Sequence, residues 1–232
     1  MGKNPKPHEL RIRKNRIALD LERIEHVRPV LPERHLFVTE GTKTEPLYLQ
    51  GMVDLIGERY GHSAKKQFRI IGEGDNTLYL LRKAEAYQQS EADDFQHVWI
   101  IYDKDDFPPD DFDNTVSRCE ALNRRFRKNG RDLKFHALWS NQCIELWFLL
   151  HFIPLEADIT REQYRTKLSE HLGRHYEKSD NTIFYSLLPH MNNAIKNAHN
   201  LMKSYDPKLS PSQKAPSTTV YQLLEKLKSY IQ

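Results

Sequence analysis

The segment from Phe95 to Tyr102, Phe-Gln-His-Val-Trp-Ile-Ile-Tyr, is the feature that most restricts the fold of this chain. Its second half is a nearly continuous apolar run, which is typical of a strand buried on both faces. Such a strand needs cover on both sides of its sheet, and in parallel sheets crossover helices supply that cover. Asp103 and Asp105 follow directly. The sequence therefore predicts a central strand of an α/β domain that delivers two carboxylates to its carboxyl end.

Further apolar segments alternate with helical patterns on both sides of this strand. Strands are predicted at Leu36–Val38, Gln67–Ile71 and Leu133–Trp139, and helices at about Glu45–Tyr60, from Thr77 onward, and at Asn114–Lys128. Strand and helix thus alternate through residues 35–150, which favours a mainly parallel sheet with right-handed crossovers. The predicted fold class is α/β, a Rossmann-like three-layer parallel sheet.

An acidic residue also follows the first predicted strand. Glu40 comes directly after the apolar run at residues 36–38, at the carboxyl end, where open α/β sheets bind ligands. Thr44 or Glu45 is a candidate cap for the next helix, and Pro46 suits its first position. Glu40 is accordingly expected at the mouth of a site. The alternative is that Glu40 only caps the following helix.

A third acidic feature lies in an apolar segment after the fourth strand. Residues 142–152 predict a helix that is apolar nearly all round, with Glu145 as its one acidic residue. A glutamate in such surroundings is rarely buried unless it is paired. Either a metal ion or an arginine or lysine partner would account for it.

Three regions are predicted along the chain. Residues 1–34 form a basic arm, 35–152 the α/β domain and 153–232 a helical extension, with helices near Arg161–Leu172, Thr182–Leu188, His190–Ser204 and Thr219–Tyr230. The net charge is +3, yet the arm holds nine Lys/Arg against five Asp/Glu, which leaves 26 against 27 in the remainder. The arm either neutralises nucleic-acid phosphates or is a solvated tail. The chain has no apolar run long enough to cross a bilayer and no apolar signal core, so we expect a cytoplasmic protein.

The acidic residues at the strand ends predict a metal site. Carboxylates that meet repel one another, and such a cluster normally holds a hard cation such as Mg²⁺ or Mn²⁺. If the segment is extended, Asp103 and Asp105 point to the same side and reach one ion. Glu45 and Asp106 are expected as further ligands or as partners of the ligands. An acidic turn before Pro108-Pro109 is the alternative interpretation.

The motifs taken together resemble the TOPRIM fold and, within it, the RloB-like family. The resemblance rests on Val38-Thr-Glu-Gly-Thr-Lys-Thr-Glu-Pro-Leu-Tyr48, Tyr102-Asp-Lys-Asp-Asp-Phe107, Ser140-Asn-Gln-Cys-Ile-Glu-Leu-Trp-Phe-Leu-Leu-His-Phe152 and Pro216-Ser-Thr-Thr-Val220. It implies that Glu40 is a general acid/base and that Asp103 and Asp105 are metal ligands. Glu145, with Ser140 before it, matches a later acidic motif of the nuclease branch. The last motif is matched only in part, because Ala215 precedes Pro216 where a polar residue is expected.

Two functions of different classes follow from these residues and this resemblance. The first is a Mg²⁺-dependent nuclease that cuts DNA or RNA and acts in phage defence, since RloB-like genes are typically found near defence loci. The second is a weakly catalytic nucleic-acid-binding or regulatory partner of a defence ATPase. Candidate phosphate contacts are Lys43, Lys104, Arg124, Arg125, Arg127 and Lys128. A solvated helix face is the alternative for the arginine-rich group. A homo-oligomer is left open.

Overall fold

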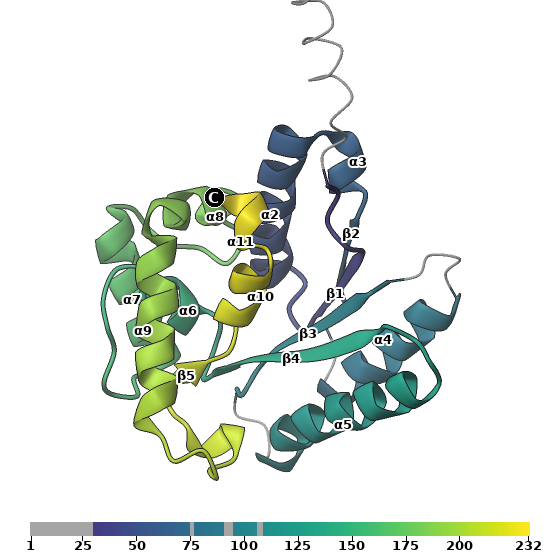
Figure 1. The fold of residues 1–232 in the computed structure, drawn as a ribbon. Helices are drawn as coiled ribbons and strands as arrows, with labels where there is room; N and C mark the ends of the chain where they lie inside the picture. The colour runs from purple at the N-terminus through teal and green to yellow at the C-terminus, as the bar shows by residue number, and fades with distance from the viewer. Residues whose placement is uncertain (1–29, 75–76, 91–94, 106–108) are drawn as a thin grey trace, which may run out of the picture. The chain divides into compact units, whose positions relative to one another are not determined.

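The computed structural model describes residues 30–74, 77–90, 95–105 and 109–232, and the predicted central strand lies in the middle of its sheet (Figure 1). The strands are β1 (His35–Thr39), β2 (Phe68–Gly72), β3 (His97–Asp103), β4 (Lys134–Asn141) and β5 (Ser217–Thr218). Their order is β2-β1-β3-β4-β5, with the first four parallel and β5 antiparallel to β4. All four parallel strands match predicted ones. β5 was not predicted, because two residues carry no periodic pattern.

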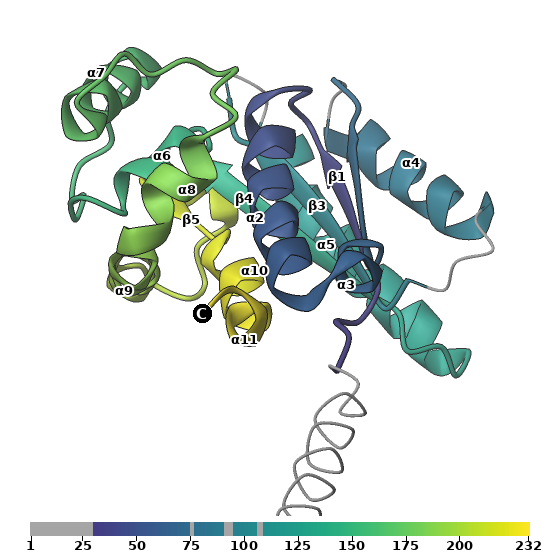
Figure 2. The ribbon, with the colours of Figure 1, turned by 90° about the horizontal axis from the view of Figure 1, so that it is seen from above.

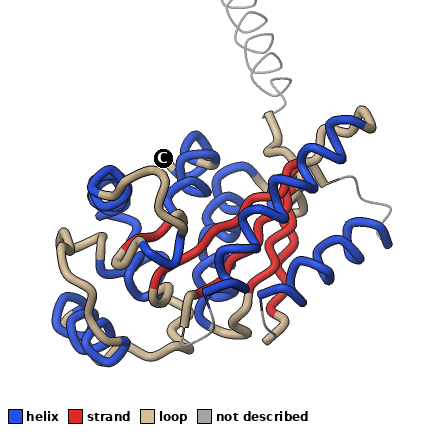
Figure 3. Tube along the Cα trace, turned by 90° about the horizontal axis from the view of Figure 1, so that it is seen from below, coloured by secondary structure: helices blue, strands red, loops and turns tan. Residues whose placement is uncertain are grey.

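Helices cover both faces of the sheet, which makes three layers (Figures 2 and 3). One face carries α4 (Thr77–Ser90) and α5 (Pro109–Lys128). The other carries α2 (Thr44–Tyr60), α3 (His62–Lys65), α6 (Glu145–Leu149), α9 (Met191–Ser204), α10 (Tyr221–Lys226) and α11 (Lys228–Ile231). The predicted α/β, Rossmann-like fold class is confirmed.

The two layers explain why β3 carries the unbroken apolar run from Val98 to Tyr102 between its polar end residues. Ile100 and Tyr102 pack in the cluster under α4 and α5, whereas Trp99 and Ile101 pack in the cluster under α2 and α6. Neighbouring residues of a strand point to opposite faces, so a strand covered on both sides has no polar face. Because β3 is buried between β1 and β4, its backbone is fixed where Asp103 leaves it.

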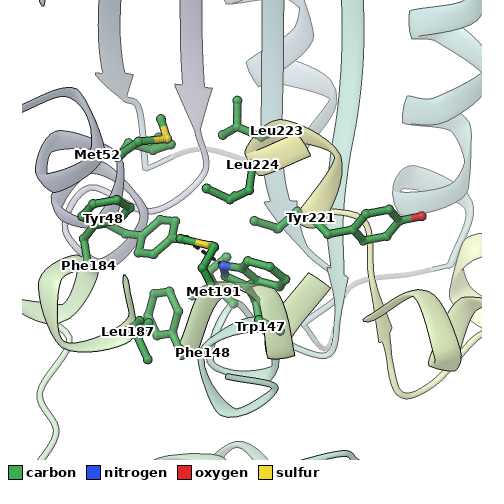
Figure 4. Packing of buried hydrophobic residues seen from close by; sticks show 14 of the residues in the cluster. Tyr48, Met52, Trp147, Phe148, Phe184, Leu187, Met191, Tyr221, Leu223 and Leu224 are labelled. Atoms are coloured by element: carbon green, nitrogen blue, oxygen red, sulfur yellow. Dashed lines mark hydrogen bonds between the residues drawn. The ribbon is translucent and has the colours of Figure 1, made fainter. Parts of the chain in front are cut away.

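The helices that follow α6 pack on the α2 side of the sheet. They include α7 (Arg161–Leu172), α8 (Ile183–Leu187), α9, α10 and α11. Figure 4 shows the shared core, in which Phe184 of α8 meets Tyr48 of α2 and the Trp147 indole N–H donates to the Tyr48 hydroxyl at 2.9 Å. Residues 32–232 form one compact unit. The predicted boundaries at residues 34 and 152 stay predictions, and residues 1–29 of the predicted arm at 1–34 lie outside the described residues.

Several element ends differ from the predicted ones for local reasons. α5 begins at Pro109 rather than near Asn114, since proline suits the first helical position. α6 is shorter than predicted and begins only after Ile144, whose N–H donates to Asp103 instead of continuing a helix. The last predicted helix is two helices separated by Leu227. Among the described helices, none combines the length and apolar character that crossing a membrane requires.

The predicted cap of α2 is wrong. The capping position is Lys43, and no side chain caps the helix there. Thr44 instead donates its hydroxyl to the Lys178 carbonyl at 3.3 Å. Glu45 is buried, with 6 % of its surface exposed, and lines a cleft. Both side chains are thus engaged in contacts with later parts of the chain.

Candidate active site

A cleft of about 340 Å³ opens at the carboxyl ends of β1 and β3, beside α6 and α7. Its acidic lining residues are Glu40, Glu45, Asp103, Asp105 and Glu145, and its basic lining residues are Lys43, Arg161, Arg165 and Lys178. The structure therefore brings together all three acidic features of the sequence. The acidic residues of the cleft come from the ends of β1 and β3, the start of α2 and the start of α6.

Asp103 is the best-anchored carboxylate of the cleft. Its Oδ2 accepts from the backbone N–H of Ile144 at 3.1 Å, and its own N–H donates to Oε2 of Glu40 at 3.1 Å. These two bonds tie the ends of β1 and β3 to the start of α6. Its Oδ1 is buried and has no hydrogen-bond partner within the described part of the chain. Buried oxygens are normally partnered, so this atom marks a place where a donor or a cation is expected.

Asp105 reaches the cleft by a turn rather than by an extended strand. β3 ends at Asp103, and Asp105 has φ of 44°, in the left-handed region that Asp tolerates better than most residues. The prediction of an extended Asp-x-Asp segment is therefore wrong. The Asp105 N–H donates to the Gln142 carbonyl at 3.2 Å, and the Asp105 carboxylate forms an ion pair with Arg161 of α7.

Glu145 and Glu45 form the buried side of the cleft. Glu145 is 2 % exposed, and its Oε1 accepts from the Tyr176 hydroxyl at 3.3 Å and lies 3.7 Å from Nε of Arg165. The arginine partner considered for Glu145 is thus present, and Glu145 still lines the cleft. Gly41 lies against Glu45, and a Cβ at that glycine would overlap the Glu45 carboxylate. This close approach is a physical reason for glycine after Glu40.

Burial and mutual repulsion raise the pKa values of these carboxyls. The pKa of Glu40 is raised to about 7, chiefly by burial and also by the charges of Asp105 and Glu45, although the hydrogen bond from the Asp103 N–H acts to lower it. Burial and the neighbouring charge of Glu145 raise the pKa of Glu45 to about 7. Burial, with Glu45 and Glu145 next in effect, raises the pKa of Asp103 well above its ordinary value. The cleft thus holds carboxyls in a state that favours a proton or another cation.

The cations that face these acids come mainly from the helical extension. Arg161 and Arg165 are four residues apart on α7, and Lys178 lies in the segment after it. Sequence reasoning missed all three. Their spacing on one helix face is visible in the sequence, but nothing local links that face to the ends of β1 and β3. Lys43, which was predicted, lines the cleft and is exposed.

Other predicted residues lie elsewhere. Ser140 is buried, and its hydroxyl shares a hydrogen bond of 3.0 Å with Thr218 of β5. Lys104 is not among the cleft-lining residues. The basic residues Arg124, Arg125, Arg127 and Lys128 are exposed in the last turns of α5, a 20-residue helix about 30 Å long, toward the amino end of the sheet. Asp106 lies outside the described residues.

The cleft holds the type of oxygen ligand that a hard metal ion prefers, but these ligands are not arranged around one ion. No group of three or more His, Cys, Asp or Glu side chains in the described ranges is positioned to hold a metal ion. The available donors are carboxylate oxygens, which suit Mg²⁺ and Mn²⁺, and the unpartnered Oδ1 of Asp103 is one of them. Asp105 is engaged by Arg161. The residues therefore fit a metal by type, and their present contacts are those of a site held by arginines.

A Rossmann-like α/β domain with an acidic cleft at its strand ends is the class of protein that the fold and site define. Compared with protein families, the chain matches the model of the RloB-like proteins over residues 35–227. The chain belongs to the RloB-like family, as its motifs predicted. No curated protein and no solved structure matches it.

Proposed function

We propose that this protein is a metal-dependent nuclease of the TOPRIM type, which cleaves phosphodiester bonds of DNA or RNA in anti-phage defence. One observation carries the proposal. Five carboxylates converge on one cleft with the buried, unpartnered Oδ1 of Asp103 among them, and four basic residues line the same cleft. Such an arrangement suits a divalent cation together with a phosphate group. The defence role and an ATPase partner rest on the family resemblance alone.

The cation in this proposal is Mg²⁺ or Mn²⁺, held by Asp103 and Asp105 with Glu40 and Glu145. When bound, such an ion polarises a phosphate oxygen and stabilises the charge that develops in the reaction. Asp103 suits the central role because backbone N–H groups already fix one of its oxygens and its residue position. Holding the ion also requires Asp105 to leave Arg161.

Glu40 has the properties of a general acid/base. Its pKa of about 7 means that protonated and ionised forms are both populated near neutral pH, which is the best condition for transferring a proton in either direction. Its carboxylate is anchored through Oε2 to the Asp103 N–H. Glu40 can therefore take a proton from an attacking water or return one to a leaving oxygen.

The exposed basic residues are the proposed contacts for the rest of the nucleic acid. Lys43 at the cleft is placed for the nearest phosphates, while Arg124 and Arg125 on α5 are too far along the sheet to meet the same phosphate. Those on α5 and the predicted arm at residues 1–34 would instead strengthen binding generally, through counterion release. The proposal therefore assigns them affinity rather than catalysis.

The test is cleavage by the purified full-length chain with Mg²⁺ or Mn²⁺. Single- and double-stranded DNA, RNA and tRNA are supplied, alone and with an ATPase of the kind that the family resemblance implies as a partner. Asp103→Asn and Asp105→Asn should each lose activity and metal affinity together. Asp54→Asn is the matched control, because Asp54 is a partly exposed acid of α2 outside the cleft. Undiminished cleavage by the Asp103 variant, or no cleavage under any of these conditions, would contradict the proposal.

A second candidate function is supported by the arginine contacts. Since Arg161 already neutralises Asp105 and Arg165 lies beside Glu145, the cleft is electrostatically balanced in part without a metal. A nucleic-acid-binding or regulatory partner of an ATPase would need no more than this. It predicts nucleic-acid binding that is unchanged by a metal chelator, whereas the nuclease proposal predicts binding and cleavage that respond to the chelator.

A further inference from the structure

Two arginines of α7 supply positive charge to the carboxylates of the cleft, where the proposed function places a metal ion. Arg161 forms a short ion pair with Oδ1 of Asp105, and Arg165 lies with Nε 3.7 Å from Oε1 of Glu145. Nε of Arg165 is buried and makes no hydrogen bond to any described residue. One arginine is thus paired with a carboxylate, while the other lies close to one without a hydrogen bond to it.

The helix that carries these arginines is fixed, but their side chains are partly open to solvent. Thr160 and Gln163 form a capping box at the start of α7, and Tyr164 and Leu168 anchor the helix in the core. The side chains of Arg161 and Arg165 are 31 % and 43 % exposed. A long arginine side chain on a fixed backbone can therefore change its partner without any movement of the fold.

A metal ion and a guanidinium compete for the same carboxylate oxygen. The oxygens of Asp105 attract a divalent cation more strongly than one guanidinium charge, but the ion must first displace the pair that is already formed. A displaced guanidinium in a cleft of this size stays near the site, and phosphate is the ligand its planar fork matches best. Arg161 could then exchange between two partners: Asp105 when no metal is bound, and a phosphate of the substrate when the metal occupies Asp105.

We propose that Arg161 is a counter-charge switch: it occupies Asp105 in the metal-free protein and transfers to a substrate phosphate when the metal binds. Arg165 supports the same exchange from the next turn of α7, opposite Glu145. This inference rests on the proposed function, since it requires a metal and a nucleic acid at this cleft. Arg161 is therefore a specificity and positioning residue that the acidic motifs alone do not reveal.

The switch has an unusual consequence for a substitution. Arg161→Ala should bind Mn²⁺ more tightly than the unaltered protein, by on the order of fivefold, because a partly exposed competing ion pair is removed. The same variant should bind a fluorescent single-stranded oligonucleotide in the presence of Ca²⁺ about tenfold more weakly, since a charge-assisted phosphate contact is lost. Arg161→Lys should fall between the two proteins in both measurements.

The experiment titrates Mn²⁺ by electron paramagnetic resonance without nucleic acid and oligonucleotide by fluorescence anisotropy with Ca²⁺, on full-length chains checked by thermal unfolding. Arg174→Ala is the matched control, because Arg174 pairs with Asp180 at 2.5 Å outside the cleft. It should match the unaltered protein in both titrations.

Three outcomes distinguish the two proposals. Tighter Mn²⁺ binding with weaker oligonucleotide binding in Arg161→Ala supports the switch. Mn²⁺ binding that is lost in Asp103→Asn but unchanged or weaker in Arg161→Ala overturns the switch and leaves the metal site standing. Mn²⁺ binding that is the same in Asp103→Asn as in the unaltered protein overturns the proposed metal site, and the switch fails with it.

Discussion

The two ends of the parallel sheet both gather ionisable side chains, but they treat them in opposite ways. At the carboxyl end, carboxyls meet in the cleft with raised pKa values and an unpartnered oxygen. At the amino end, three neighbouring strands each place a histidine in a cluster formed by His35, His97 and His136. The described hydrogen bonds of this cluster each join two groups of the same chain.

The histidine cluster is closed by its own hydrogen bonds. His97 meets His136 through Nδ1 at 2.9 Å and the Glu33 carboxylate through Nε2 at 2.9 Å, and Glu33 pairs with Lys226 at 2.5 Å. The Trp99 indole N–H donates to Nδ1 of His35 at 2.9 Å. Burial lowers the pKa of His35 and of His136 to about 3, so both rings are neutral at physiological pH.

The difference separates structural from functional polar groups in this molecule. Hydrogen-bonded groups of complementary type stabilise a fold, whereas like charges brought together cost free energy unless a ligand compensates for it. The histidine cluster should therefore carry stability, and the acidic cleft should carry activity. The following predictions test this division, beginning with the largest expected effect.

Glu40→Gln should remove turnover and leave the fold intact. Loss of a general acid/base lowers the rate by on the order of 10²–10⁴-fold, while the amide still accepts from the Asp103 N–H. The free energy of unfolding should stay within about 1 kcal/mol of the unaltered value, since the hydrogen bond remains. Cleavage rate and urea unfolding measure these two quantities. A destabilised Glu40→Gln protein that retains its rate would reverse the division between the two ends.

His97→Ala should show the opposite pattern. The change removes the ring partner of His136, leaves Glu33 with Lys226 alone and opens a gap, so it should lower the free energy of unfolding by about 2–4 kcal/mol. Cleavage per folded molecule should be unchanged. His199→Ala is the control, because His199 meets Glu225 on the surface, and its effect should stay within about 0.5 kcal/mol. Loss of metal affinity in His97→Ala would show that the acidic cleft at the carboxyl end of the sheet depends on the histidine cluster at the amino end.

Acid should remove the stability that His35 contributes, while the cleft carboxyls act in the opposite direction because their pKa values are raised in the folded protein. The folded pKa of His35, about 3, lies below the ordinary value of 6.5, so the unfolded chain binds more protons at this group between these values, and the contribution of His35 to stability falls as the pH drops below 6.5. For His35 alone the loss between pH 7 and pH 5 is roughly 2 kcal/mol.

The measurement is urea unfolding at both pH values. His35→Gln keeps an acceptor for the Trp99 N–H but does not titrate, so on going from pH 7 to pH 5 its free energy of unfolding should end higher, relative to its value at pH 7, than that of the unaltered protein. His199→Gln, at the surface, should respond to pH as the unaltered protein does. An equal change in all three proteins would mean that His35 does not contribute.

Tyr176→Phe should have the smallest effect of the series. It removes the hydroxyl that donates to the buried Glu145 carboxylate at 3.3 Å, which should cost about 1 kcal/mol of unfolding free energy. Tyr60→Phe is the control, because its hydroxyl donates to a carbonyl at the exposed surface. If Tyr176→Phe is as stable as the control, the Tyr176 hydroxyl does not contribute to holding the buried Glu145 carboxylate.

The elements of the sheet were predictable because their signals are local. An apolar run with acidic residues at its end identifies β3 and Asp103 from a few neighbouring positions, and the same holds for β1 and Glu40. Parallel strands then bring those ends to one edge by topology alone. The family follows from the same motifs, since they fall within the matched residues 35–227.

The partners of the acidic residues were decided only by the tertiary structure. Arg161 meets Asp105 from 56 residues away. Glu45 lies in the first turn of α2 rather than at its cap, because the capping position is Lys43. The left-handed backbone at Asp105, not an extended strand, aims its carboxylate at α7. Strand ends follow from hydrophobic periodicity within a few residues, whereas the contacts across the cleft depend on how a distant helix packs against the sheet, which no local pattern encodes.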